Sequence, residues 1–168
     1  GRILAQDVCA QFDAPRFDNS AMDGYAVCGL QQQNWLLTDS IAAGDATHGL
    51  QLQTGQAMRI LTGAAIPAGT EAVIAQEDVN VLDGLLVCDR PLKSGQHIRR
   101  LAEEYAAGEV LLPAQMRLNA AAVGVIASQG LQHVACFRRI RITVLSSGNE
   151  LQVPGCELKE NQIYDSNR

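Results

Sequence analysis

Aromatic residues and long apolar runs are both scarce in this chain of 168 residues. Phe, Trp and Tyr together make up 4% of the sequence, although 47% of all residues are hydrophobic. No apolar run approaches the roughly 18 residues that a membrane-spanning helix needs, and the first residues lack the basic and then apolar order of a signal peptide. We therefore expect a soluble cytoplasmic protein without membrane contact, large enough for one or two domains.

Positive charge and cysteine motifs are also in short supply. The 13 Lys and Arg residues are outnumbered by 18 Asp and Glu residues, and the net charge of −5 argues against nucleic-acid binding. The five cysteines are widely spaced and contain no Cys-x-x-Cys pair, so we expect free thiols rather than disulfides or a zinc site. A Walker loop, a Gly-x-Gly-x-x-Gly motif and a recognisable Ser/His/Asp triad are missing too, and we interpret His48 and His133 as structural.

Short apolar runs between glycines and polar residues predict strands through the first hundred residues. The strongest local signal lies at 79–87, where Asp83-Gly84 separates two apolar arms. This pair favours a type I′ hairpin turn, because both central residues of that turn need a positive φ. Further strands are predicted at 25–27, 35–37, 57–61 and 71–75.

A helix is predicted in the second half of the chain, at the Ala-rich segment 120–129. Asn119 is its expected N-cap, and Gly130 is expected just past its end. A strand is expected next at 134–137. Residues 140–145 alternate and then become wholly apolar, which is typical of an inner strand of an α/β sheet.

The last residues predict the start of another helix, with Asp165 or Ser166 as its cap. A single strand and a cap cannot bury an α/β core. We therefore expect that Arg168 is not the natural end of the protein and that an α/β domain continues beyond it.

The segment 15–27 concentrates polar side chains between apolar runs. It holds Asp18, Asn19, Ser20 and Asp23, so two carboxylates stand five residues apart with an amide between them. Such a set could bind Mg²⁺, which prefers oxygen ligands. A capped turn, in which the same side chains bond to backbone N–H groups, is the alternative that the spacing alone favours.

Two further segments carry groups suited to anions. In 59–69 a predicted strand runs into Thr62 and Gly63, whose hydroxyl and open backbone suit an anionic oxygen. The segment 97–100 ends in two arginines, and arginine forks suit phosphate or molybdate-like oxyanions. Ordinary loop connections and a solvated surface strand with weak Glu–Arg pairs are the alternatives.

The polar turn at 146–150 follows the predicted strand 140–145, at the usual edge of an α/β ligand site. Glu150 there could reach a metal ion or a ligand hydroxyl. A glycine turn with a surface glutamate is the alternative interpretation, and Asp165 is more simply a helix cap on spacing alone.

Taken together, these segments resemble the molybdopterin molybdenumtransferase family, known as MoeA in bacteria and as the E domain of gephyrin in animals. The first matching motif is long and specific, with the sequence P-R-F-D-N-S-A-M-D-G-Y-A-V. The resemblance runs in order along essentially the whole chain, through 15–27, 57–69, 71–78, 140–151 and 162–168.

The resemblance implies an activity in molybdenum cofactor biosynthesis. Family members take adenylylated molybdopterin and molybdate, hydrolyse the adenylate in a Mg²⁺-dependent step, and release molybdenum cofactor and AMP. It also implies a homodimer, whose active-site cleft forms between an inserted domain of one subunit and the α/β domain of the other. We expect this chain, as an incomplete fragment, to be inactive alone.

The resemblance also implies roles for particular residues. Asp23, Thr62 and Glu150 would be catalytic, and Asp23 and Glu150 would be the metal ligands from the two sides of the cleft. The substrate-binding residues that it implies are Arg100, Glu104, Ser147 and Asp165.

The implied fold is of the α+β class and β-rich. An elongated β domain would use 1–18 and 105–138, and an α+β domain would be inserted at 19–104. Residues 139–168 would begin a truncated α/β, Rossmann-like domain that binds molybdopterin.

Two departures from the family pattern leave a second interpretation open. Ala102-Glu103-Glu104 stands where Gly-Glu-Asp is usual, and Asn149 stands where Asp is usual. The longer side chain at Glu104 would shift its carboxylate by about 1.5 Å, enough to disturb tight catalytic geometry. A non-catalytic binding or dimerisation module of the same fold is therefore the alternative, with an unrelated α+β ligand-binding domain as a third.

Overall fold

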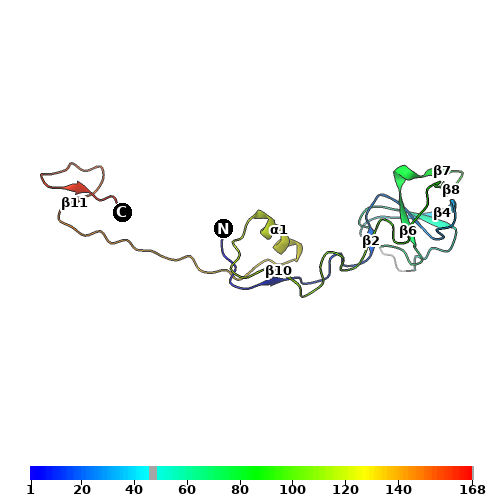
Figure 1. Cartoon of the computed structure of the whole chain (residues 1–168), viewed down its shortest axis with the longest axis horizontal. Coiled ribbons are helices and arrows are strands. Elements are labelled where there is room, and N and C mark those ends of the chain that lie inside the picture. Colours follow the sequence, from blue (N-terminus) through cyan, green and yellow to red (C-terminus); the bar gives the residue numbers. More distant parts are fainter. Residues whose placement is uncertain (46–48, 168) are drawn as a thin grey trace.

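The computed structural model describes residues 1–45 and 49–167, so His48 and Arg168 lie outside the described residues. The molecule is long and narrow, with its strands concentrated at one end (Figure 1). The labels β2, β4, β6, β7 and β8 gather at that end, α1 and β10 lie in the middle, and β11 lies near the C-terminus. The β-rich character that the sequence predicts is confirmed.

The largest element is a six-stranded sheet with the order β6-β3-β5-β4-β8-β7. The inner strand β3 pairs antiparallel with both β5 and β6, whereas β4 and β5 run parallel. Every strand predicted between residues 25 and 87 is present. The bounds are β3 (Gly24–Val27), β4 (Asn34–Ile41), β5 (Gln56–Ile60), β6 (Ala72–Ala75), β7 (Asn80–Leu82) and β8 (Leu85–Val87).

The hairpin of β7 and β8 forms as its turn residues predict. Asp83 has a φ of 48° and Gly84 a φ of 79°, the positive values that a type I′ turn requires. Strand β4 extends beyond the predicted segment 35–37. Nothing in the sequence indicated its second half, because residues 38–40 are polar and exposed and the register shifts between Leu37 and Ser40.

Both faces of this sheet are covered by apolar side chains. Along β3, Ala26 enters one buried cluster while Tyr25 and Val27 enter the other. This alternation explains why β3 and β6 are buried at every position. Burying one valine- or leucine-sized side chain contributes about 1.5–3 kcal/mol to stability, so these short strands are held mainly by packing.

A separate apolar cluster forms in the middle of the molecule. It includes Leu4, Leu112 and Ile126, from β1 (Val8–Cys9) and its preceding residues, β10 (Val110–Leu112) and α1 (Ala120–Ser128). Strands β1 and β10 pair antiparallel. The helix prediction is confirmed.

The ends of α1 show why the sequence specifies it. The Asn119 side chain accepts a hydrogen bond from the backbone N–H of Ala122 at 2.8 Å, which satisfies an N-terminal donor. Gly130 follows the helix with a φ of 69°, a conformation that favours glycine.

The prediction that 19–104 contains α-helix is wrong for the described residues of that range. They contain one 3₁₀ turn, η1 (Gln76–Asp78), and no α-helix. The apolar runs of this region pair as strands of the large sheet instead, and glycines with positive φ stand in the turns between them. Within the described part of the chain, no helix has the length and apolarity that crossing a bilayer requires.

The strand predictions after α1 are corrected. The predicted strand at 134–137 is reduced to a single bridge between Leu4 and Cys136. The predicted strand at 140–145 is absent, and Ile140 and Leu145 are 87% and 89% exposed. A strand needs hydrogen-bonded neighbours, and no described residue pairs with this segment.

The helix start predicted at 165–166 stays a prediction, because the described residues end at Asn167. Just before it, β11 (Leu151–Gln152) and β12 (Ile163–Tyr164) form a short parallel pair. The Asp165 carboxylate still accepts a hydrogen bond from the backbone N–H of Asn167 at 3.0 Å, as a capping side chain does. All five cysteines are free thiols, as expected.

Candidate active site

Three segments that the sequence marks as candidate sites meet beside the large sheet. Strand β2 (Asn19–Ser20) pairs antiparallel with β9 (Ile98–Arg99), and Asn19 also forms a bridge with Ala65. The backbone N–H of Gly63 donates to the carbonyl of Ser20 at 2.9 Å. The polar loop, the Thr62 loop and the arginine loop are therefore held together by backbone hydrogen bonds.

Asp23 and Thr62 are in direct contact. Asp23 Oδ1 accepts hydrogen bonds from the backbone N–H of Thr62 at 2.8 Å and from its hydroxyl at 2.7 Å. They meet because Asp23 immediately precedes β3 and Thr62 closely follows β5, and Gly24 is paired with Ile60 across these two strands. Asp23 Oδ2 accepts no hydrogen bond from the described residues.

The hydrogen bonds to Asp23 keep its carboxylate ionised. The backbone N–H of Thr62, followed by the Thr62 hydroxyl, lowers the pKa of Asp23 from its ordinary value. Both residues are exposed, so this is an accessible anionic oxygen pair. A capped turn would bond Asp23 to its own local backbone, whereas these hydrogen bonds join Asp23 to a residue 39 positions away in the sequence.

Gly24 is required by the close approach of β6. A Cβ atom at this position would lie 1.9 Å from the carbonyl oxygen of Ile74 and 3.1 Å from the Cα of Ala75. Both are backbone atoms of β6, which is buried at every position and paired with β3, so they cannot move aside cheaply. The Asp-Gly order of the motif therefore places a carboxylate at the very start of a tightly packed strand.

Arg100 is paired with Asp18, from the other end of the polar segment. Its NH1 atom lies 2.7 Å from Asp18 Oδ2, while Asp18 Oδ1 accepts the backbone N–H of Leu101 at 2.8 Å. The Leu101 N–H, and then the Arg100 guanidinium, lower the pKa of Asp18. Spacing could not reveal this pair, because its members are 82 residues apart in sequence.

The turn after Arg100 has a strained backbone. Ala102 has a φ of 60°, in the left-handed region that favours glycine, which fits the family's usual glycine at this position. The Glu103 carboxylate accepts the backbone N–H of Arg100 at 2.7 Å. Glu104 is exposed, and its backbone N–H donates to Ala14 at 2.8 Å. The weak Glu–Arg side-chain pair expected at this surface is therefore replaced by a hydrogen bond from the Arg100 backbone to the Glu103 carboxylate.

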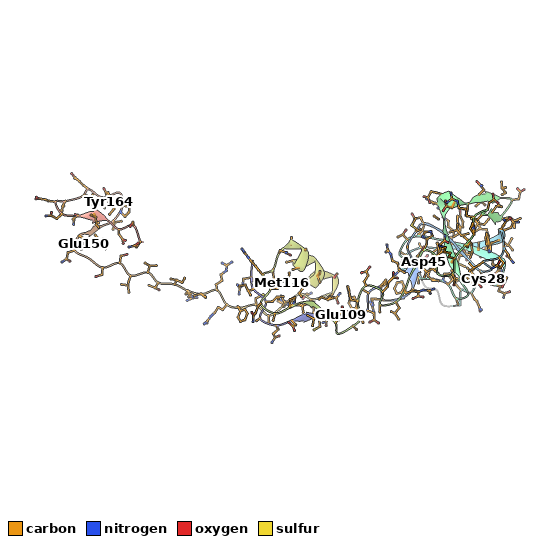
Figure 2. All side chains as sticks on the ribbon, in the orientation of Figure 1. Cys28, Asp45, Glu109, Met116, Glu150 and Tyr164 are labelled. Atoms are coloured by element: carbon orange, nitrogen blue, oxygen red, sulfur yellow. The ribbon has the colours of Figure 1, made fainter. Side chains whose placement is uncertain are left out.

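Glu150, Ser147 and Asp165 lie in a different part of the molecule. Glu150 is found toward the C-terminal end, on the far side of α1 from β2 (Figure 2). Asp165 is buried and lines a cavity of about 320 Å³ together with Ser146, its neighbour Leu145 and Val144, whereas Ser147 does not line it. Within one chain, the structure therefore does not bring Glu150 to Asp23.

Comparison with known proteins decides the family. The family model that describes the MoeA N-terminal region, domains I and II, matches residues 1–130. The chain belongs to the MoeA family. The family model covers Asp23, Thr62, Arg100 and Glu104, and it ends before Glu150.

The MoeA relatives extend the match to nearly the whole chain. A molybdopterin molybdenumtransferase from Haemophilus influenzae is 42% identical over 99% of this chain and 42% of its own length. One from Nostoc sp. is 38% identical over 100% of this chain and 40% of its own. The chain thus spans about two fifths of the length of the curated MoeA relatives that it matches.

A solved MoeA structure supports the fold. The molybdopterin biosynthesis MoeA protein from Pyrococcus horikoshii matches 99% of this chain and 44% of its own, with a TM-score of 0.83 and 32% sequence identity. The match therefore includes the C-terminal residues that the family model leaves out.

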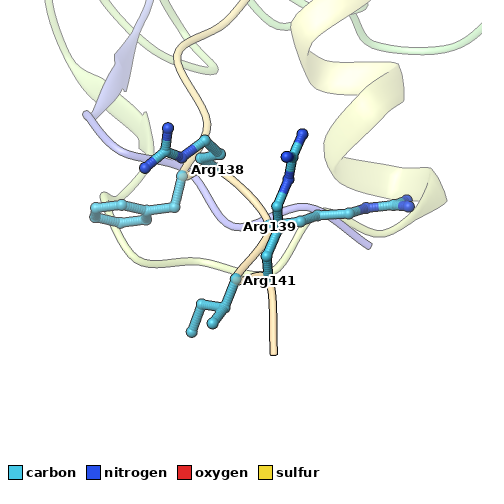
Figure 3. Close-up of a pocket in the computed structure, with 5 residues that line it drawn as sticks. Arg138, Arg139 and Arg141 are labelled. Carbon is cyan, nitrogen blue, oxygen red and sulfur yellow. The ribbon is translucent and has the colours of Figure 1, made fainter. Parts of the chain in front are cut away.

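Two cavities away from the large sheet are lined by none of the predicted site residues. These adjoining cavities of about 640 and 650 Å³ share the segment 137–140, and one of them also contacts Arg2. Figure 3 shows Arg138, Arg139 and Arg141 extending from one short stretch of backbone. None of these arginines is among the site residues predicted from the sequence.

Proposed function

We propose that the protein containing this chain is a molybdopterin molybdenumtransferase, which inserts molybdenum from molybdate into adenylylated molybdopterin and releases AMP. The observation that carries this proposal is the contact of Asp23 with Thr62, beside the Asp18–Arg100 pair. It combines an ionised carboxylate with a nearby guanidinium, the two groups that an anionic substrate and its counter-ion require. The substrate class, molybdopterin and molybdate, is supported by the names of the relatives, which match nearly the whole of this chain.

The chemistry of Asp23 fits Mg²⁺. This cation is held in proteins by one or two carboxylates together with water and substrate phosphates. Asp23 Oδ1 carries both bonds from Thr62, so Oδ2 remains for a cation, and Glu150 is the proposed second ligand. When bound, Mg²⁺ neutralises negative charge on phosphate oxygens.

The remaining roles follow from the groups that each residue offers. Thr62 fixes the orientation of Asp23 and keeps it ionised through two hydrogen bonds. Arg100 binds an anionic oxygen of molybdate or of the adenylate phosphate, since its side chain is 56% exposed and ends in a guanidinium. Further contacts to substrate are proposed for Glu104, Ser147 and Asp165.

We propose that the complete site is shared by two subunits of a homodimer. Strand β2, which ends three residues before Asp23, lies on one side of α1 (Figure 1), and Glu150 lies on the other side, toward the C-terminus (Figure 2). A second subunit could supply Glu150 to the Asp23 of the first. The described residues contain no group of three His, Cys, Asp or Glu side chains that could hold a metal within one chain, so the carboxylates of a shared site are expected to converge only in the dimer.

The domain division proposed from the sequence is supported by the apolar clusters. The cluster around Leu4 and Leu112 draws on residues before 9 and after 110, whereas the two sheet clusters draw only on residues between 25 and 98. We therefore propose an inserted domain at 19–104 within a domain formed by 1–18 and 105–138. Residues from 139 onward belong to a third, molybdopterin-binding domain.

Subunit mixing tests the function and the shared site together. In the complete protein encoded by its gene, Asp23→Asn and Glu150→Gln should each abolish AMP release from adenylylated molybdopterin. A mixture of the two variants should regain about a quarter of the wild-type rate, because half of the dimers then hold one intact site of two. Asp39→Asn, an exposed carboxylate on β4, is the control and should remain fully active.

The outcomes of this mixing experiment separate the possible errors. Activity that stays normal in Asp23→Asn contradicts the proposed site. Two inactive variants that do not complement each other contradict the sharing between subunits but leave the activity in place. Residues 1–168 alone should release no AMP.

The non-catalytic module remains the second candidate, because Ala102 holds a left-handed conformation and Glu104 is longer than the usual Asp. If the complete protein is inactive and Glu104→Asp restores AMP release, the longer side chain is the cause of the loss. If the unchanged protein already turns over, the second candidate is excluded.

A further inference from the structure

We propose that Asp18 is a positioning residue that fixes the Arg100 guanidinium and the turn at 100–104 for anion binding. This inference rests on the proposed function, in which Arg100 binds an anionic oxygen of the substrate. It assigns a role to the first carboxylate of the polar segment, whereas the proposed catalytic roles use only the second, Asp23.

One carboxylate oxygen of Asp18 binds a side chain and the other binds the backbone of the same loop. Oδ2 accepts from Arg100 NH1 at 2.7 Å, and Oδ1 accepts from the Leu101 N–H at 2.8 Å. One carboxylate therefore fixes both the direction of the guanidinium and the position of the backbone that carries it. The pKa of Asp18 is lowered by these same bonds, so the carboxylate is ionised at neutral pH.

The contact with Asp18 leaves most of the Arg100 donors available. A guanidinium has five N–H donors in a planar fork, and the described residues take one of them at NH1. The side chain of Arg100 is 56% exposed and that of Asp18 37% exposed. The guanidinium of Arg100 is thus held at one edge, and its other N–H donors can bind a tetrahedral oxyanion. Because the side chain is already held, binding costs less conformational entropy.

The turn that follows depends on carboxylates for its shape. The N–H of Arg100 donates to Glu103 Oε2 at 2.7 Å, and the next N–H, that of Leu101, donates to Asp18. Ala102 then takes its left-handed φ of 60°. The Ala102 N–H itself donates to the Pro15 carbonyl at 3.1 Å. A strained residue persists where its surroundings fix it, and Asp18 supplies one of the several bonds that do so here.

Three substitutions at one position separate the two bonds. Asp18→Asn keeps an oxygen for the Leu101 N–H but presents no charge to Arg100, Asp18→Ala removes both bonds, and Asp18→Glu keeps the charge. In the complete protein, with molybdate as the varied substrate, we expect Asp18→Asn to raise KM about tenfold while kcat changes less than threefold. Asp18→Ala should raise KM further, and Asp18→Glu should recover part of the affinity.

Asp13 provides a matched control. Its carboxylate also accepts a backbone N–H, that of Ala107 at 2.8 Å, but it has no guanidinium partner in the described residues. Asp13→Asn should leave KM for molybdate unchanged. If Asp13→Asn and Asp18→Asn raise KM equally, the effect is general loosening of the loops and the positioning role is wrong.

Arg100→Ala separates failure of this inference from failure of the proposed function. If Arg100→Ala leaves KM for molybdate unchanged, the proposed anion-binding role of Arg100 is wrong. If Arg100→Ala raises KM but Asp18→Asn does not, Arg100 acts alone and only the positioning role of Asp18 is wrong. Because Asp18 acts through Arg100, the double variant should be no worse than Arg100→Ala alone.

A readout without catalysis tests the contact itself. In residues 1–168, the amide proton of Leu101 should shift in NMR spectra as Asp18 titrates, with a midpoint below the ordinary aspartate value of about 3.9. Asp18→Asn should abolish this titration while the rest of the spectrum stays folded. A Leu101 amide that does not respond to pH in the unchanged chain contradicts the contact.

Discussion

Residues 24–75 and residues 138–149 contain apolar runs of similar quality, but the structure uses them in opposite ways. Strands β3 and β6 are buried at every position, whereas Ile140 and Leu145 are 87% and 89% exposed. The difference lies in their neighbours, because β3 is paired on both edges and 140–145 on neither within the described residues. An apolar run therefore becomes a buried strand only where neighbouring strands are present to pair with it.

The same contrast separates the two halves of the candidate site. Asp23 stands on a loop tied by hydrogen bonds to the segments around Thr62 and His97. Glu150 is exposed, and its backbone carbonyl accepts one hydrogen bond, from the N–H of Ile163 at 2.7 Å. A half-site built on packed strands is preorganised within the chain, whereas the other half depends on the few contacts around β11 and β12.

Adding a methyl group at Gly24 should expose this contrast most strongly. The new Cβ would lie 1.9 Å from the Ile74 carbonyl, so Gly24→Ala should destabilise the chain by about 3 kcal/mol or more. In the other region, Gly148→Ala would meet only the flexible Glu150 carboxylate and should change stability by less than about 0.5 kcal/mol. Urea unfolding followed by fluorescence of the buried Trp35 measures the effect of Gly24→Ala on the sheet, and circular dichroism of the whole chain measures the effect of Gly148→Ala. Equal effects would contradict the packing described for β3.

Limited digestion with trypsin should show the next largest difference. Cleavage after Arg138, Arg139 and Arg141 should be at least about tenfold faster than cleavage after Arg59, because a protease needs an unpaired backbone. Arg59 is a strict comparison, since its side chain is also exposed but its backbone lies within β5. Mass spectrometry of early fragments identifies the cuts. A first cut inside the large sheet would contradict the contrast between the regions.

Ala102→Gly should strengthen the packed half of the site. Ala102 has a φ of 60°, and a left-handed conformation costs a residue with a side chain about 1 kcal/mol relative to glycine. The substitution should therefore stabilise the chain by about 1 kcal/mol in urea unfolding. Ala107→Gly is the control, because its φ is ordinary and the change should destabilise by about 0.5 kcal/mol. Destabilisation by Ala102→Gly would rule out strain at this turn.

Local signals predicted the elements that depend on local physics. Asp83-Gly84 correctly predicted the hairpin, and Asn119 and Gly130 correctly predicted the ends of α1, since each acts within a few residues of itself. The strand at 140–145 was wrong because pairing is a property of two segments.

The candidate site was predictable only in part. Spacing favoured a capped turn for Asp23, and it was the family resemblance that pointed to Thr62 as its neighbour in the cleft. The Asp18–Arg100 pair follows from neither, because the register of β2 and β9 places Asp18 beside Arg100. Such contacts depend on the tertiary fold, which no local motif encodes.

The smallest effect concerns the charge of Asp23. Hydrogen bonds from Thr62 lower the folded-state pKa of Asp23, so its ionised form stabilises the folded chain above the unfolded pKa of about 3.9. This contribution is lost as the pH falls through the folded-state pKa. Asp23→Asn keeps an oxygen that accepts both Thr62 bonds but cannot ionise. The stability difference between the two proteins should therefore be largest near neutral pH and should shrink in acid.

Thermal unfolding followed by circular dichroism between pH 7 and pH 2.5 measures this difference. Asp18 is present in both proteins, so its own acid titration cancels in the comparison. A constant difference between wild type and Asp23→Asn at every pH would show that Thr62 does not favour the charged carboxylate. The contrast between the two half-sites would then rest on packing alone.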